Sequence, residues 1–110
     1  MRQGKVYIHG RYAGLLTEEN SQYYTFEYDA DYLHKEGAEP VCLTMPLSEK
    51  RYESNVLFPY FSNLLSEGEN RQYQARLLRI DEQDDFGILL ATASYDTIGC
   101  VTITPVNNGI

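Results

Sequence analysis

The sequence of 110 residues has no tryptophan, only two cysteines and only two histidines. A small secreted domain usually carries a larger, even set of cysteines as a disulfide framework, so Cys42 and Cys100 indicate a reduced, cytoplasmic protein. A single buried disulfide between them stays open as an alternative. A zinc site would need all four of Cys42, Cys100, His9 and His34 to converge, and no close-spaced pair supports one. We therefore expect no bound metal.

Long apolar runs and excess positive charge are also absent. No stretch is long enough to span a membrane, and the charged N-terminus is not followed by the apolar segment of a secretory signal. Sixteen acidic residues against nine basic ones give a net charge of −7. Such a chain repels both a nucleic-acid backbone and an anionic membrane. We expect no direct nucleic-acid or membrane contact, and a protein partner with a basic face.

What the sequence does contain is enough apolar material for one hydrophobic core. Hydrophobic residues make up 43% of the chain, including ten Tyr and four Phe. This length accommodates one domain, which we place at residues 1–105, followed by a flexible tail at 106–110. Buried tyrosines need hydrogen-bond partners, so several of the ten are expected at surfaces or interfaces.

The hydrophobic pattern predicts an α+β domain with a mostly antiparallel sheet and three to four short helices. Tyr24, Phe26 and Tyr28 should share one face of a strand, and Tyr73, Leu77 and Ile80 should face inward from a helix. The expected strands are 5–9, 13–16, 22–28, 40–45 and 98–103; the expected helices are 30–35, 56–65, 66–80 and 86–93; the expected loops are 17–21, 47–55 and 81–85.

No residue pattern in the chain supports catalysis. Asp85-Phe86-Gly87 spells the magnesium-binding tripeptide of protein kinases, but no glycine-rich loop or His-Arg-Asp catalytic loop accompanies it. We expect Asp85 to cap the helix over 86–93 and Phe86 to fill the core. Both cysteines lie in expected apolar strands, and no Gly-x-Ser-x-Gly motif occurs. The sequence thus predicts a non-enzyme without catalytic residues or cofactor.

Two further segments are candidates for binding. The acidic connector at 81–85 lacks the spacing of a calcium loop, so a solvated turn is favoured over a site for a cation or a basic partner. The segment FPYFSNLLSEG at 58–68 is a dense apolar helix that runs into a turn. There Ser66 and Glu69 have the spacing of a capping box. Its aromatic content exceeds what one face of a short helix can bury.

Together with other short motifs along the chain, this segment resembles the N-terminal domain of HipA-type serine/threonine kinases. The matching pieces occur in family order over nearly the whole chain: residues 6–8 and 13–15, 40–47, 58–68, 84–91 and 98–105. In full-length HipA proteins this domain precedes the kinase core, which carries ATP binding and phosphoryl transfer. The resemblance therefore implies an α+β fold like HipA N-terminal subdomain 1 and a non-catalytic, protein-binding role.

The resemblance further implies a stand-alone bacterial counterpart, similar to HipS of the HipB–HipS–HipT toxin–antitoxin systems. There the small protein binds and neutralises the kinase HipT, and HipB supplies DNA binding. The expected partner is thus a HipT- or HipA-like kinase, with a HipB-like protein reached through the complex. One alternative is a structural subunit that completes a split HipA kinase. Another is an independent small enzyme or ligand-binding domain.

The resemblance places the partner-binding site at the turn over 66–70. Relatives of this small-domain type often carry Trp after the Ser-Glu-Gly turn, whereas this sequence has Glu69. The turn is therefore expected to engage basic groups of the kinase through Glu67 and Glu69. The full set of expected partner-binding residues is Ser66, Glu67, Gly68, Glu69 and Asn70.

Overall fold

The computed structural model describes residues 1–65, 68–93 and 101–106. Within these ranges, five strands form one antiparallel sheet in the order β4-β3-β2-β1-β5, accompanied by four helices. The strands are β1 Arg2–Ile8, β2 Arg11–Asn20, β3 Tyr23–Tyr28, β4 Arg51–Ser54 and β5 Val101–Pro105. The helices are α1 Ala30–Leu33, α2 Pro59–Ser62, α3 Gly68–Leu78 and α4 Asp85–Thr92. The predicted α+β class and mostly antiparallel sheet are confirmed.

The sheet is built on the hairpin of β1 and β2. His9 and Gly10 turn the chain with φ of 51° and 79°, the left-handed conformation that a tight hairpin turn requires. Strand β2 runs to Asn20, so the predicted loop at 17–21 is wrong over most of its length. The polar residues there are strand residues because Thr17 pairs with both neighbouring strands, β1 and β3.

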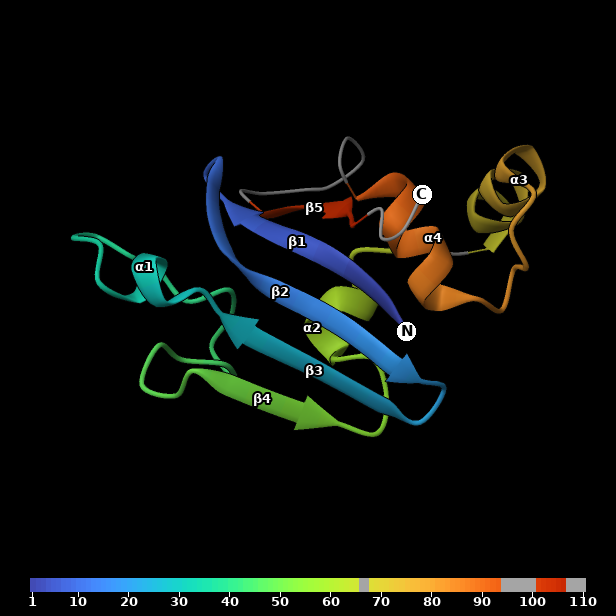
Figure 1. Cartoon of the computed structure of the whole chain (residues 1–110). Coiled ribbons are helices and arrows are strands. Elements are labelled where there is room, and N and C mark those ends of the chain that lie inside the picture. The colour runs from blue at the N-terminus through green and yellow to red at the C-terminus, as the bar shows by residue number, and fades with distance from the viewer. Residues whose placement is uncertain (66–67, 94–100, 107–110) are drawn as a thin grey trace.

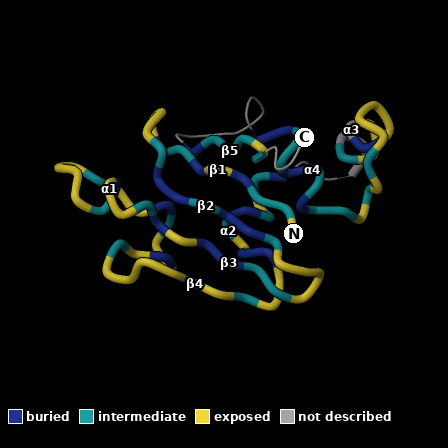
Figure 2. Tube along the Cα trace, in the orientation of Figure 1, coloured by how far each residue is buried: buried dark blue, intermediate teal, exposed yellow. Residues whose placement is uncertain are grey.

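The helices α2 and α4 cover one face of the sheet and enclose the core (Figure 1). Phe26 and Tyr28 of β3 are fully buried there and Tyr24 packs against the same core, as their shared face predicted. Phe61 of α2 lies against Phe26 with ring centroids 5.8 Å apart. Helix α4 was predicted within one residue at each end, and it contributes Phe86, Ile88 and Leu89. No helix of the described residues lies on the opposite face of the sheet (Figures 1 and 2).

The predicted strand at 40–45 is wrong, because that segment is an irregular loop. Two tyrosines bond to the backbone of this segment and of the residue just before it. The Tyr28 hydroxyl donates to the Met45 carbonyl at 2.5 Å and accepts from the Val41 N–H at 2.9 Å. The Tyr32 hydroxyl donates to the Glu39 carbonyl at 2.7 Å. The fourth strand is β4 instead, within the predicted loop at 47–55, where alternating side chains suit a sheet edge.

Replacing Tyr28 with Phe is expected to lower the free energy of unfolding by about 2 kcal/mol. The ring stays, but the buried Val41 N–H and Met45 carbonyl each lose their hydrogen-bond partner. Urea denaturation followed by circular dichroism would measure the change. Tyr12→Phe is the matched control, since no hydrogen bond to the Tyr12 hydroxyl is found among the described residues, and it should be nearly neutral. Equal effects of the two substitutions would contradict the prediction.

The last strand and the helix predicted at 56–65 differ from prediction in extent. Only residues 101–103 of the predicted strand at 98–103 are described, and β5 continues to Pro105. The predicted helix at 56–65 shrinks to the four residues of α2, although Leu57 and Leu65 on either side are buried. Residues 107–110 of the expected tail lie outside the described residues, so the tail stays a prediction.

Candidate functional site

The expected partner-binding turn lies only partly within the described residues. Ser66 and Glu67 fall outside them, and so does the predicted capping box that begins at Ser66. Gly68, Glu69 and Asn70 form the first turn of α3, but the side chains of these three positions are not described. What the structure describes is the frame on either side of the turn. Helix α2 packs in the core before it, and α3 lies beyond α4 at one end of the molecule (Figure 1).

Arg71 anchors α3 to the acidic connector that precedes α4. Its guanidinium donates to the Glu82 carbonyl at 2.7 and 3.0 Å and forms an ion pair with the Asp85 carboxylate. The Arg71 side chain is only 19% exposed. Asp85 was predicted to cap the next helix, and this is wrong: the cap is Asp84, whose carboxylate accepts from the Gly87 N–H at 3.2 Å. Asp85 is held by Arg71 instead.

Arg2 joins the start of the chain to the same connector. Its two terminal nitrogens donate to the two Asp84 oxygens at 2.8 Å each, and its Nε donates to Glu18 at 2.8 Å. The guanidinium also lies over the Phe86 ring, 5.3 Å from its centroid. The sequence does not predict this contact, because no local pattern around a single arginine near the N-terminus indicates which distant carboxylate it pairs with.

The pKa of Asp84 lies below its ordinary value of 3.8, chiefly because of its hydrogen bond with Arg2. The ionised carboxylate therefore stabilises the folded chain above that value, and the contribution is lost as the pH falls through the lower folded-state pKa. We expect Asp84→Asn, which still caps α4, to cost about 1 kcal/mol at neutral pH. Its stability should also fall less than that of the wild type on acidification below pH about 4.

Denaturant titrations of both proteins at neutral pH and through the acid range would measure this difference. Asp81→Asn is the matched control, since the one hydrogen bond that the Asp81 side chain accepts among the described residues comes from the backbone N–H of Gln83 in its own turn. Parallel stability–pH curves for the wild type and Asp84→Asn would contradict the assignment of the acid-sensitive contribution to the contact with Arg2.

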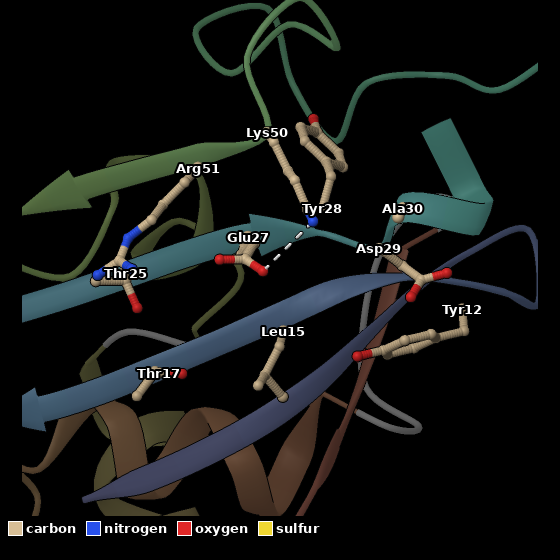
Figure 3. Close-up of a pocket in the computed structure, with 10 residues that line it drawn as sticks. All are labelled: Tyr12, Leu15, Thr17, Thr25, Glu27, Tyr28, Asp29, Ala30, Lys50 and Arg51. Atoms are coloured by element: carbon tan, nitrogen blue, oxygen red, sulfur yellow. Dashed lines mark ion pairs between the residues drawn. The ribbon is translucent and has the colours of Figure 1, made fainter. Parts of the chain in front are cut away.

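The uncovered face of the sheet has a shallow depression of about 360 Å³ (Figure 3). Figure 3 shows Tyr12, Leu15 and Glu27 along its floor, with Lys50 directed toward Glu27. Those two charges form an ion pair at 4.0 Å and are both about half exposed. Burial is the main cause that raises the pKa of Tyr12, so its hydroxyl stays protonated at neutral pH. The residues that line the depression include no histidine, cysteine or serine to act as base or nucleophile.

Helix α3 presents its apolar residues outward, which contradicts the predicted inward face. Tyr73 and Leu77 are 61% and 63% exposed, whereas Ala75 is buried. Ile80 is partly buried against the core, beyond the end of the helix. The physical reason is the Arg71 anchor, which turns the side of α3 that carries Arg71 and Ala75 toward α4 (Figure 2 colours the rest of α3 largely exposed).

A family model for the HipA N-terminal domain matches residues 4–104. The chain belongs to the HipA N-terminal domain family. The match confirms the resemblance drawn from the sequence, and it indicates a role related to toxin–antitoxin systems. The family is that of a non-catalytic subdomain of HipA.

Two other proteins are similar to this chain over nearly its whole length. A solved structure described as the N-terminal domain of HipA toxin is 30% identical, with a TM-score of 0.74 over 99% of this chain and 96% of that one. An uncharacterized protein of Haemophilus influenzae is 37% identical over 103 residues, which cover 94% of this chain and 92% of that protein. Among the described residues of this HipA-type domain, no helix is long and apolar enough to cross a membrane, and no cluster of three or more His, Cys, Asp or Glu could hold a metal ion.

Proposed function

We propose that this chain is a cytoplasmic antitoxin of bacterial HipBST type that binds a HipT- or HipA-like serine/threonine kinase and neutralises it. The observation that carries the proposal is the family match over residues 4–104, which covers a HipA domain that does not itself perform phosphoryl transfer. The net charge of −7 supports a protein partner and leaves DNA contact to a HipB-like protein in the complex.

The binding site in this proposal is the turn over 66–70, with Ser66, Glu67, Gly68, Glu69 and Asn70. The frame around the turn supports it, because α2 is held in the core and α3 is anchored through Arg71. A turn held at both ends loses little conformational freedom on binding, which favours affinity. Glu67 and Glu69 then meet basic groups of the kinase.

Co-expression with the cognate kinase tests the proposal. We expect growth arrest by the kinase alone and rescue when this chain is present, together with a stable complex of the two purified proteins. Kinase activity that rises on complex formation would instead identify a subunit that completes a split kinase. Turnover by this chain alone, or ATP-dependent phosphorylation that disappears in Asp85→Asn, would support an independent enzyme and overturn the proposal.

A further inference from the structure

The outward face of α3 carries apolar side chains that nothing in the described structure covers. Tyr73 and Leu77 are four residues apart, so they lie next to each other on one side of the helix. Their exposed fractions of 61% and 63% are high for large apolar residues. Ala75 is two residues from each and faces the opposite, buried side. The amphipathic pattern of the sequence is therefore present, but it points away from this chain's own core.

Basic residues are concentrated in this part of an otherwise acidic chain. Three of the nine basic residues of the chain lie between positions 71 and 79. Arg71 forms an ion pair with Asp85 and a hydrogen bond to the Glu82 carbonyl. In contrast, no carboxylate of the described residues forms an ion pair with Arg76 or Arg79. These two arginines and the two exposed apolar side chains form the surface that we call the α3 face: Tyr73, Arg76, Leu77 and Arg79.

Arg79 occupies a backbone conformation that does not favour its side chain. Its φ is +56°, in the left-handed region that glycine adopts most readily. The residue follows the last turn of α3, where the Ile80 N–H bonds back to the Ala75 carbonyl at 2.9 Å. Glycine is the usual residue at such a helix end. The requirements of the backbone therefore do not account for an arginine here.

We propose that the α3 face docks into an apolar groove bordered by carboxylates on the protein partner. The inference rests on the proposed function, since that partner is the kinase. Aromatic and arginine side chains are those that most often dominate binding energy at interfaces, and spacing of three and four residues suits a helix that lies in a groove. Charge complementarity supports this kind of partner, because Arg76 and Arg79 are exposed and no carboxylate of the described residues pairs with them.

A second copy of this chain fits the α3 face less well. The acidic connector would be the natural counterpart, but Asp84 and Asp85 already pair with Arg2 and Arg71. A nucleic acid would gain phosphate contacts from only Arg76 and Arg79, whereas the net charge of −7 repels it. A membrane surface would bind only Tyr73 and Leu77, which is little apolar area for membrane binding. The face is therefore assigned to the kinase.

The test measures binding of the full chain to the purified kinase by titration calorimetry. We expect the Tyr73→Ala/Leu77→Ala variant and the Arg76→Glu/Arg79→Glu variant each to bind at least tenfold more weakly. The charge variant should also bind with a smaller salt dependence than the wild type. Arg79→Gly should weaken binding while the fold is retained, because glycine suits that backbone conformation. Leu43→Ala is the control: Leu43 is 95% exposed on the 40–45 loop, away from α3, and binding should not change.

The outcomes separate the two proposals. If the wild type binds the kinase and all α3 variants bind equally well, the α3 face is not the docking surface, and the proposed function stands. If the wild-type chain does not bind the kinase, the proposed function fails and this inference fails with it. Sedimentation of the chain alone should show a monomer. Self-association that disappears in Tyr73→Ala/Leu77→Ala would assign the face to a second copy and overturn the proposal.

Discussion

Replacing both Glu67 and Glu69 with Lys is expected to weaken kinase binding about 100-fold, or by about 3 kcal/mol, while the fold stays intact. Under the proposed function these carboxylates meet basic groups of the kinase, so the substitutions turn attraction into like-charge contact. Titration calorimetry measures the affinity, and growth rescue on co-expression measures the consequence in the cell. The loss should shrink at high salt, because added ions screen the repulsion.

Two further variants separate the effect of charge reversal from the loss of charge and from the loss of helix stability. Glu67→Gln/Glu69→Gln removes the charges without reversing them, so its binding should lie between those of the wild type and the Lys variant. Ser66→Ala tests the capping box, and it should cost mainly helix stability, on the order of 1 kcal/mol. If the Lys variant folds normally and still neutralises the kinase with unchanged affinity, the turn is not the interface. The acidic connector at 81–85 would then be the next surface to test, through Asp81 and Glu82.

Phe61→Ala is expected to lower the free energy of unfolding by about 4 kcal/mol. The Phe61 side chain is fully buried, and its ring centroid lies 5.8 Å from that of Phe26 and 5.4 Å from that of Tyr60. Truncation leaves a cavity under a helix of only four residues, which has few backbone hydrogen bonds of its own to keep its shape. Urea denaturation followed by circular dichroism measures the change.

A loss of this size is a large share of the total stability of a domain of this length, so milder variants accompany it. Phe61→Leu keeps most of the apolar volume and should cost about 1 kcal/mol. Leu43→Ala deletes a side chain that is 95% exposed and should change the stability by less than about 0.5 kcal/mol. Similar losses for Phe61→Ala and Leu43→Ala would mean that α2 is not the element that closes the core.

Local patterns predicted much of this fold because their physical causes are local. The alternation of Tyr24, Phe26 and Tyr28 places all three on the core side of β3, since neighbouring side chains of a strand point to opposite faces. The run at 86–93 is apolar along most of its length, and it forms α4 over Asp85–Thr92. The family resemblance was also available in the sequence, because it depends on the order of short motifs.

The features that the sequence did not predict depend on contacts between residues that are far apart in the chain. The sequence does not distinguish Asp84 from Asp85 as the helix cap. In the structure Arg2, 82 residues away, pairs with the capping residue Asp84, and Arg71 pairs with Asp85. The loop at 40–45 has a strand-like composition, but its Val41 N–H and Met45 carbonyl bond to the Tyr28 hydroxyl, and the Glu39 carbonyl just before it bonds to the Tyr32 hydroxyl. A propensity argument has no access to such partners, because they depend on how the whole chain packs.

By itself, the sequence determined the α+β class, the family and the amphipathic character of the segment that forms α3. Only the tertiary structure decided which way that helix faces. Periodicity specifies that Tyr73 and Leu77 lie together, but it does not specify what they face. The partly buried ion pair of Arg71 with Asp85, together with the hydrogen bonds of Arg71 to the Glu82 carbonyl, sets the rotation of α3, because these contacts hold the Arg71 side of the helix against the acidic connector. The apolar stripe that the sequence predicts as core is therefore left on the surface of the folded chain.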